Sequence, residues 1–476
     1  MHPSPSSREQ PLIRIWPMHT GGALRGKRRR DMRASVAACA VIAGSLVAVA
    51  AAAQPAPVDV HGAPEPMEHE MMTTPLGIPE TREASGTSWQ PESTPMFMWH
   101  AMMGGWALGF HTSVFAGYDN TRSNRGDDKF ISINWLMAMA RHPVGDGDVT
   151  LRAMLSLEPF TVGEAGYPLL LQTGETVNGE PLHDRQHAHD LFMELAARYR
   201  RPIGDSVGVE IYVAPSGEPA IGPPAFPHRF TAMANPLATL GHHWQDSTHI
   251  SFGVVTAGVF TRKLKLEGSW FNGREPDEQR YDLDLRTPDS FAARATANPT
   301  ENLSAQVSWA RLDSPEALEP GVSVQRTTAS VLWNRRSDDG ARDLAAMALF
   351  GNNHPSLGPS TSAGLGEGAL MLDGKHTIFT RVELLEKTGR DLALPPAMDD
   401  RTFGMASFSA GYLYDVTGLG EVVPGVGVVG TIDSVGTGLA PFYGTRAPWG
   451  AMVFARLRAP EMKPGGAMSG HMMHGM

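Results

Sequence analysis

The stretch Asn302-Leu-Ser-Ala-Gln-Val-Ser-Trp-Ala310 alternates apolar and polar side chains at almost every position. Because successive side chains of an extended strand point to opposite faces, such a strand has one apolar face and one polar face. Similar runs recur along the chain at 251–260, 264–269, 381–386, 403–412 and 452–457. A strand that lies between lipid and a polar interior requires this alternation. The sequence therefore predicts an all-β fold, an antiparallel transmembrane β-barrel.

The connections between these runs alternate in length, as they do at the two ends of outer-membrane barrels. Short turns are expected at 142–148, 201–205, 262–263 and 335–340, and long loops at 119–128, 160–190, 215–247, 272–279, 313–321 and 352–375. The connection at 387–401 is longer than this scheme requires, and 422–435 has no clear register. The pattern gives about 14 strands, within a range of about 12–16, over the barrel region, residues 105–460.

Several polar residues alternate with the apolar ones and are therefore expected to point into the lumen or to lie near its rim. They are Glu267, Gln306, Arg381, Glu383, Arg456 and Arg458. A soluble β-sandwich or propeller remains the alternative architecture, because its strands alternate too.

The first 53 residues are typical of a secretory signal peptide. A basic segment at 25–33 precedes an uncharged run rich in Ala and Val at 34–53, which ends in three alanines. We expect cleavage after Ala53; if translation starts at Met32, residues 1–31 are not part of the protein. A membrane anchor is the alternative interpretation of this run. The single cysteine of the chain, Cys39, lies within it, so disulfides and thiolate metal sites are not expected after cleavage.

Composition argues against several classes of protein. Hydrophobic residues make up 42% of the chain and its mean hydropathy is −0.20, and no later stretch is long and apolar enough for a membrane helix. A net charge of −10 argues against nucleic acid as a partner and favours cations. The common metalloprotease, serine-hydrolase and phosphate-loop motifs do not occur in the sequence, so we do not expect an enzyme.

Methionine and histidine cluster in both terminal segments. We expect residues 54–104 to form a flexible periplasmic leader and 461–476 a polar tail. Thioether and imidazole together suit Cu(I), because soft sulfur ligands select soft metal ions; low-complexity sequence with no metal role is the alternative. The candidate ligands are His61, Met67, His69, Met71 and Met72 in the leader and Met468, His471, Met472, Met473, His474 and Met476 in the tail.

Inside the barrel region, the densest group of candidate ligands comprises His183, Asp184, His187, His189 and Asp190. Two of these histidines, two positions apart, share one face of an extended segment. Imidazoles with nearby carboxylates suit Zn²⁺, Cu²⁺ or Ni²⁺. The alternative is a polar plug of the lumen in which Arg185 pairs with Asp190. A looser group follows at His242, His243, Asp246 and His249, and a Met-rich run at 96–103 is interpreted as the apolar start of the barrel.

Four segments carry a family resemblance: Ser-Leu-Glu-Pro at 156–159, Gly-Tyr-Pro at 166–168, Gln-Thr-Gly-Glu-Thr at 172–176 and Pro-Leu-His-Asp-Arg-Gln-His-Ala-His-Asp at 181–190. They resemble a family of uncharacterised exported bacterial proteins whose members accompany copper and heavy-metal resistance determinants. The layout of a Met/His-rich leader before a barrel is similar to that of copper-resistance protein B of the outer membrane. This chain departs from it by a short leader cluster and an added tail. The resemblance implies metal tolerance at the cell envelope, without a mechanism.

We therefore expect an outer-membrane barrel that binds or exports copper-like ions, Cu(I) or Cu(II), captured by its termini. No cofactor is required, and the expected partners are outer-membrane lipid, metal ions and periplasmic copper-handling proteins. If both termini are periplasmic, the strand number is even and both Met/His segments lie at the inner mouth. One alternative is a general solute channel with no metal role. The other is a soluble periplasmic enzyme or metal chaperone of the β class.

Overall fold

The computed structural model describes residues 73–462. The expected signal peptide, the Met/His ligands of the leader and those of the tail lie outside these residues. Within the described part of the chain, no helix has the length and apolar character needed to cross a bilayer.

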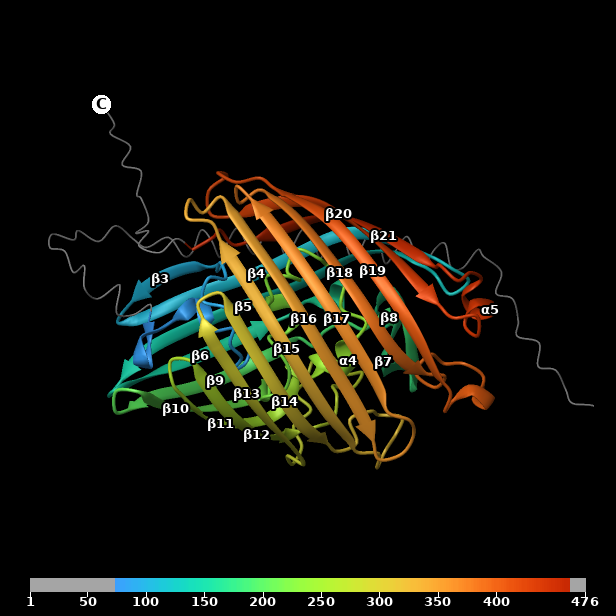
Figure 1. Cartoon of the computed structure of the whole chain (residues 1–476), viewed down its shortest axis with the longest axis horizontal. Helices are drawn as coiled ribbons and strands as arrows, with labels where there is room; N and C mark the ends of the chain where they lie inside the picture. Colours follow the sequence, from blue (N-terminus) through green and yellow to red (C-terminus); the bar gives the residue numbers. More distant parts are fainter. Residues whose placement is uncertain (1–72, 463–476) are drawn as a thin grey trace, which may run out of the picture.

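Sixteen antiparallel strands form a closed barrel (Figure 1). Strand β21 closes it by pairing with β20 on one side and β4 on the other, where Arg458 lies opposite Ser113. The short β3 (Trp99–Met103) pairs with the first residues of β4, beyond the end of β21, and stands outside the sixteen. The barrel strands are β4 (Trp106–Arg122), β5 (Asp128–Val144), β6 (Gly147–Leu155), β9 (Phe192–Ile203), β10 (Val207–Gly217), β11 (Ser251–Phe260), β12 (Leu264–Asn272), β13 (Ser290–Thr300), β14 (Leu303–Leu312), β15 (Val324–Arg336), β16 (Arg342–Pro355), β17 (Thr361–Leu372), β18 (His376–Thr388), β19 (Thr402–Asp415), β20 (Val423–Val435) and β21 (Trp449–Arg458).

The predicted antiparallel barrel is confirmed, but its strand number is 16 and the expectation of about 14 is wrong. The interval 352–375, expected to be one long loop, contains β17. On the outward face of β17 stand Gly364, Gly366 and Gly368. Because glycine supplies no side chain, the apolar half of the alternation is missing there. In strand β20 a glycine interrupts the inward face instead: Gly427 stands between the exposed Val426 and Val428 and leaves room for the ring of Phe454.

The barrel is apolar on its outer surface and polar inside. In β14, Val307 is 57% exposed, whereas its neighbour Gln306 is 7% exposed. Strand β12 repeats this pattern, with Leu266 exposed between the buried Lys265 and Glu267. The residues expected in the lumen are confirmed to be buried: Glu267, Gln306, Arg381, Glu383, Arg456 and Arg458.

Short and long connections lie at opposite ends of the barrel. The chain enters β4 and leaves β21 at the same end, because these strands are antiparallel neighbours. At this end, called the turn end, connections such as β5–β6 and β9–β10 are short. The opposite end, called the loop end, carries the long connections at 156–191, 218–250 and 273–289. The connection at 389–401 also lies at the loop end, which accounts for its length.

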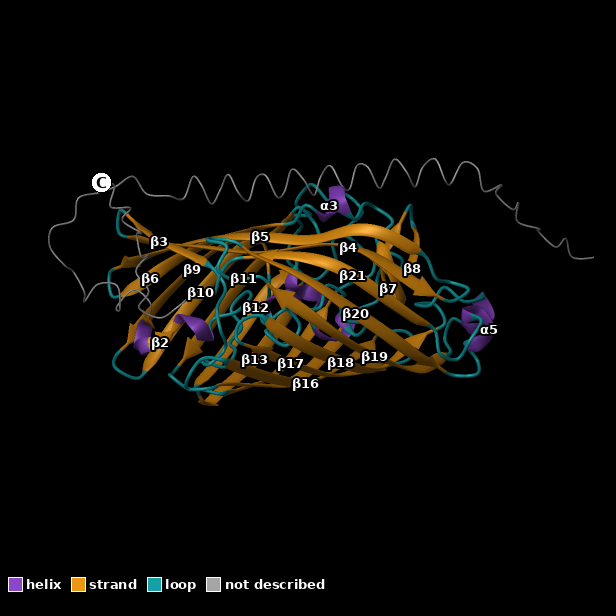
Figure 2. Cartoon of the chain, turned by 90° about the horizontal axis from the view of Figure 1, so that it is seen from above, coloured by secondary structure: helices purple, strands orange, loops and turns teal. Residues whose placement is uncertain are grey.

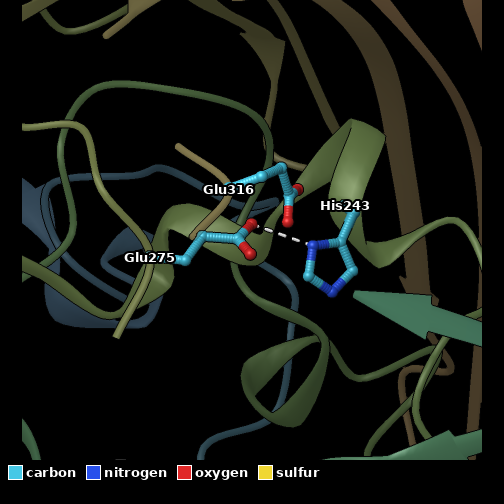
Figure 3. A group of neighbouring side chains, drawn as sticks. All are labelled: His243, Glu275 and Glu316. Atoms are coloured by element: carbon cyan, nitrogen blue, oxygen red, sulfur yellow. Dashed lines mark hydrogen bonds and ion pairs between the residues drawn. The ribbon is translucent and has the colours of Figure 1, made fainter. Parts of the chain in front are cut away.

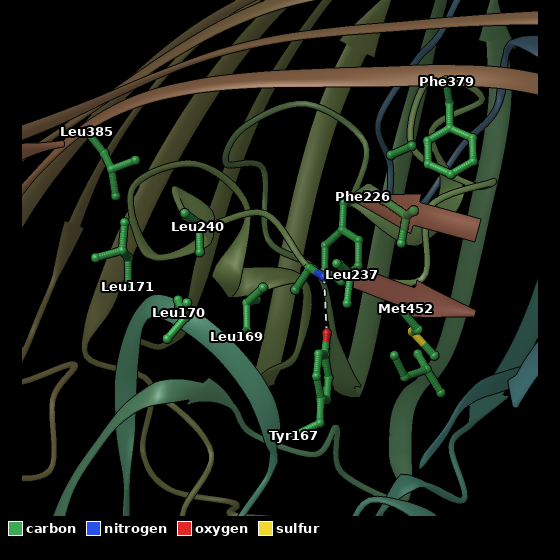
Figure 4. Close-up of a cluster of buried hydrophobic side chains, with 14 of the residues drawn as sticks. Tyr167, Leu169, Leu170, Leu171, Phe226, Leu237, Leu240, Phe379, Leu385 and Met452 are labelled. Atoms are coloured by element: carbon green, nitrogen blue, oxygen red, sulfur yellow. Dashed lines mark hydrogen bonds between the residues drawn. The ribbon is translucent and has the colours of Figure 1, made fainter. Parts of the chain in front are cut away.

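Inserted segments fill much of the lumen (Figure 2). The loop at 218–250 packs against the hairpin of β7 (Tyr167–Val177) and β8 (Glu180–Gln186) in one buried apolar cluster (Figure 4). The hydroxyl of Tyr167 accepts a 3.0 Å hydrogen bond from the backbone N–H of Ala238, which joins the two segments.

Residues 73–98, expected to belong to a flexible leader, also make contacts inside the barrel, at the turn end. The remaining elements are short. They are β1 (Thr73–Thr74), β2 (Ile78–Pro79), α3 (Glu158–Thr161), α4 (His242–Gln245), α5 (Ala440–Tyr443) and the 3-10 helices η1 (Pro75–Gly77), η2 (Glu80–Arg82), η3 (Phe226–His228), η4 (Ser247–His249) and η5 (Pro396–Met398).

At the turn end, the buried carboxylate of Asp415 on β19 accepts hydrogen bonds from two arginines of β21, Arg456 (2.7 Å) and Arg458 (2.9 Å). We expect Asp415→Asn to lower the free energy of unfolding by about 3 kcal/mol or more, because it leaves two buried guanidinium groups without their counter-ion. Urea titration in detergent micelles, followed by heat-modifiable gel mobility, measures the change. The exposed turn variant Asp373→Asn is the control, and an equal effect in both variants would contradict the prediction.

Candidate functional site

The inserted segments are held in the lumen by buried ion pairs with the strands. At the turn end, Glu83 accepts hydrogen bonds from Arg198 and, at 2.8 Å, from Arg200, both on β9. Burial alone raises the pKa of Glu83, but the two guanidinium groups outweigh it and hold that pKa well below its usual range. Glu83 therefore stays ionised and anchors the segment at 73–98 to the two arginines of β9.

The loop at 218–250 is anchored through Arg229, whose side chain is fully buried. Its guanidinium donates to Asp246 of the same loop at 2.6 Å and to Glu367 of β17 at 3.1 Å. Glu367 also accepts a 3.1 Å hydrogen bond from Arg381 of β18. This chain of alternating charges connects the loop to the barrel wall.

Two sequence groups that are far apart along the chain meet at the loop end of the lumen. His187 and His189 follow β8, whereas His242, His243 and His249 lie in α4 and η4 of the inserted loop. The ring centroids of His187 and His242 are 6.5 Å apart, and those of His189 and His249 are 5.3 Å apart. All five rings are buried, and together they are called the histidine cluster.

Each ring of the histidine cluster has its Nδ1 atom beside an oxygen acceptor. In a neutral imidazole, such a contact selects the tautomer with its proton on Nδ1 and leaves the lone pair on Nε2. The acceptors are the backbone carbonyl of Ala188 for His187 (3.1 Å), Glu158 for His189 (2.9 Å), Asp246 for His242 (2.7 Å), Glu275 for His243 (2.8 Å) and the backbone carbonyl of Asp246 for His249 (2.9 Å).

The pKa values of the five histidines depend on their burial and on the neighbouring carboxylates. Burial lowers the pKa of His187, His242 and His249, so these imidazoles are neutral at pH 7. Burial acts in the same direction on His189 and His243, but neighbouring carboxylates outweigh it and raise both pKa values, that of His243 to about 8. Neutral imidazoles can act as metal ligands, whereas imidazolium ions cannot.

Two glutamates stand beside the Nδ1 atom of His243 (Figure 3). One ligand atom from each of His243, Glu275 and Glu316 lies within 4.8 Å of the other two. Burial and the charge of Glu275 raise the pKa of Glu316 to about 8, so Glu316 keeps its proton at pH 7. Because the Nδ1 atom faces Glu275, the Nε2 atom of His243 points away from both carboxylates.

Of the other predicted ligands of the 183–190 segment, Asp190 lines the same small cavity as the five histidines, whereas His183 and Asp184 do not line it. His183 is partly exposed beside Arg125. Asp184 accepts hydrogen bonds from the backbone N–H of Leu171 and the hydroxyl of Tyr443. Asp190 pairs at 3.0 Å with Arg280. The expected Arg185–Asp190 pair is therefore wrong: Arg185 pairs with Asp127 instead.

Three of the four segments that carry the family resemblance meet at the histidine cluster: 156–159, 172–176 and 181–190, which contains His187 and His189. Glu158, from the 156–159 segment, holds His189. From the 172–176 segment, Glu175 lies 3.2 Å from the Nε2 atom of His187, and Gly174 lies against the ring of His243. Sequence reasoning did not identify these residues as part of a site, although the short segments that contain them were noticed.

A second cavity, about 90 Å³ in volume, lies at the turn end and is rich in thioether and imidazole groups. His111 and His228 are 6.1 Å apart there, and the ring of Trp135 contacts both, at 4.7 and 4.8 Å between centroids. Burial lowers the pKa of His228 to about 3. The methionines and histidines that line this Met/His cavity are Met96, Met98, Met137, Met139, Met233, His100, His111 and His228.

Gly174 tests the packing of the histidine cluster. A Cβ atom at this position would lie 2.1 Å from the Nε2 atom of His243, so we expect Gly174→Ala to displace that ring. Gly179 is the matched control, because its φ is also positive (+74°) but a Cβ there meets nothing within 4 Å. Gly179→Ala should cost about 1 kcal/mol of unfolding free energy from strain alone, and Gly174→Ala about 1–3 kcal/mol more, as measured by urea titration. Equal costs would show that the ring of His243 is not held where we describe it.

Neither protein-family models nor curated proteins yield a match to the chain. Several solved structures are similar to about three quarters of the chain. OmpF of Salmonella typhi in complex with daunomycin has a TM-score of 0.45 at 9% identity, over 76% of this chain and 100% of that one. A loop-deletion mutant of the outer-membrane protein OmpT of Vibrio cholerae has a TM-score of 0.44 at 8% identity, over 74% and 99%. An anion-selective porin from Comamonas acidovorans has a TM-score of 0.41 at 10% identity, over 74% and 99%. These similarities concern barrel architecture and assign no activity to the chain.

Proposed function

We propose that the chain is an outer-membrane β-barrel that acts as a solute channel, closed in the described state by its own inserted segments. The observation that carries this proposal is the ion-pair network of Arg229, which ties a long loop to the inner wall at Glu367. Displacing a loop held by side chains leaves the strand hydrogen bonds of the barrel intact. Opening therefore requires rearrangement of the loop and no unfolding of the wall.

The outer surface supports a place in the membrane. The apolar side chains of Val307, at the middle of β14, and of Leu266, on β12, are both more than half exposed. Exposed aromatic side chains gather toward the loop end of the strands, where outer-membrane barrels carry a girdle of aromatic residues at the lipid–water interface. These residues are Tyr118, Trp270, Phe291, Trp309, Phe350 and Trp449.

Metal handling is the second candidate function, and the Met/His cavity is the observation that favours it. Thioether and neutral imidazole groups suit soft ions such as Cu(I). This cavity lies at the end where the chain enters and leaves the barrel. The terminal Met/His ligands and the periplasmic copper-handling partners stay predictions, because the termini lie outside the described residues.

Measurements of ion conductance test whether the inserted loop closes the channel. We expect the wild-type protein in planar lipid bilayers to conduct rarely and weakly, and Arg229→Met to raise the open fraction several-fold, because the loop loses its pairs with Asp246 and Glu367. Arg390→Met is the control, since Arg390 is 51% exposed and its ion pairs lie outside the lumen. A wild-type protein that conducts as freely as the Arg229 variant would refute closure by this loop.

A substitution on the outer surface tests the membrane placement. Val307→Arg puts a charge at the middle of β14, so we expect it to lower the free energy of unfolding in lipid vesicles by about 2–4 kcal/mol. Val307→Leu is the apolar control and should change little. If the wild-type protein stays dispersed in buffer without detergent, with Val307→Arg as stable as the control, the outer surface does not face lipid.

A further inference from the structure

Three connections at the loop end bring one histidine and two glutamates together. His243 belongs to α4 of the inserted loop, Glu275 to the connection between β12 and β13, and Glu316 to the connection between β14 and β15. The last two connections also meet through their backbones, because the N–H of Glu275 donates a 3.1 Å hydrogen bond to the carbonyl of Pro315. These three side chains are called the His/Glu group, and they converge from segments that are far apart in the sequence (Figure 3).

The spacing of the His/Glu group suits a metal ion. One ligand atom from each of the three residues lies within 4.8 Å of the other two, and the Nδ1 atom of His243 is 2.8 Å from an oxygen of Glu275. Ligand atoms that surround a four-coordinate ion at about 2.0–2.2 Å are roughly 3–3.5 Å from one another. Small rotations of the three side chains are therefore sufficient to place their ligand atoms around one ion.

An unpartnered carboxylate oxygen supplies a second, independent observation. The Oε2 atom of Glu275 is buried and has no hydrogen-bond partner among the described residues. A buried carboxylate oxygen is costly unless a donor or a cation reaches it. Glu316 is only partly buried, so an ion can reach the His/Glu group from the solvent at the loop end.

The charges around the group favour a divalent cation. Glu275 and Glu316 carry two negative charges when both are ionised, and one divalent ion neutralises them. Around them, Asp391 and Arg326 act on Glu316 with opposite signs and offset each other. His243 and Glu316 hold protons at pH 7, because both pKa values are raised. The ion displaces these protons, and His243 keeps its other proton on Nε2, which leaves the lone pair on Nδ1 for the ion.

We propose that the Nδ1 atom of His243 and one carboxylate oxygen each of Glu275 and Glu316 bind one divalent transition-metal ion of the Zn²⁺ class, with water as the fourth ligand. Imidazole suits Zn²⁺, and carboxylates are also ligands of this ion. The group contains no sulfur ligand, so a soft ion such as Cu(I) does not fit it. A bound ion joins the inserted loop to two connections between wall strands. The site does not depend on the proposed channel function, because an ion can bind whether or not the barrel conducts.

Zinc titration of the folded full-length protein in detergent, after removal of metal with a chelator, tests the proposal. Competition calorimetry should find one high-affinity Zn²⁺ ion per chain. Glu316→Gln and His243→Gln should each weaken its binding roughly 100-fold or more, because removal of a direct ligand costs at least as much as removal of a supporting group. The zinc X-ray absorption spectrum of the one-ion complex should show nitrogen and oxygen ligands without sulfur.

Two substitutions are matched controls. Glu319→Gln removes a carboxylate from the connection that carries Glu316, but Glu319 pairs with the exposed Arg390. Asp282→Asn removes a carboxylate from the connection that carries Glu275, within a separate acidic group. Both variants should retain the high-affinity ion, because neither residue supplies a ligand to it.

The tail double variant His471→Ala with His474→Ala should also retain the ion. Heat-modifiable gel mobility establishes that each variant is folded, and the nearly isosteric Glu316→Gln keeps the test decisive if His243→Gln does not fold. Four results would overturn the proposal: no high-affinity ion in the wild-type protein, unchanged affinity in Glu316→Gln, loss of the ion in a control or tail variant, or sulfur ligands at the zinc ion.

Discussion

Charge inside a closed barrel has to be neutralised by other protein groups, and this constraint governs the structure. The polar face of each strand turns inward, so arginines, lysines and carboxylates are enclosed where water is scarce. An isolated charge there would be prohibitively costly, whereas a paired and hydrogen-bonded one is tolerated. The wall does not neutralise all of its own charges: Arg198 of β9 pairs with Glu83, which comes from the inserted segment at 73–98.

The inserted segments are thus structural parts of the barrel as well as obstacles in its lumen. The loop at 218–250 links the two ends of the interior: Phe226 contacts the histidine cluster, and His228, two residues later, lines the Met/His cavity. One segment therefore connects the groups at the loop end of the interior with those at the turn end.

Strand alternation was readable from the sequence wherever both faces carry side chains, as in β14 and β12. It was not readable in β17, where glycines replace the outward apolar residues, or in β20, where Gly427 makes room for a ring from the neighbouring strand. The two histidine groups were each recognisable as dense sets of ligand residues. Their meeting was not predictable, because about fifty residues of chain, including β9 and β10, separate them, and local pattern carries no information about how loops fold back into a lumen.

By itself, the sequence determined that the chain forms strands with one apolar and one polar face, because alternation with period two is a local property of extended backbone. It favoured closure into an antiparallel barrel over a soluble β-sandwich or propeller. It also determined which residues are candidate ligands. The tertiary structure alone decided that residues 73–98 enter the barrel, that Glu158 and Glu175 stand beside the histidines, and that His183 and Asp184 do not join them. The physical reason is that buried charges and imidazoles are satisfied by whichever groups the folded chain brings within hydrogen-bond distance, and those groups come from segments far apart in the sequence.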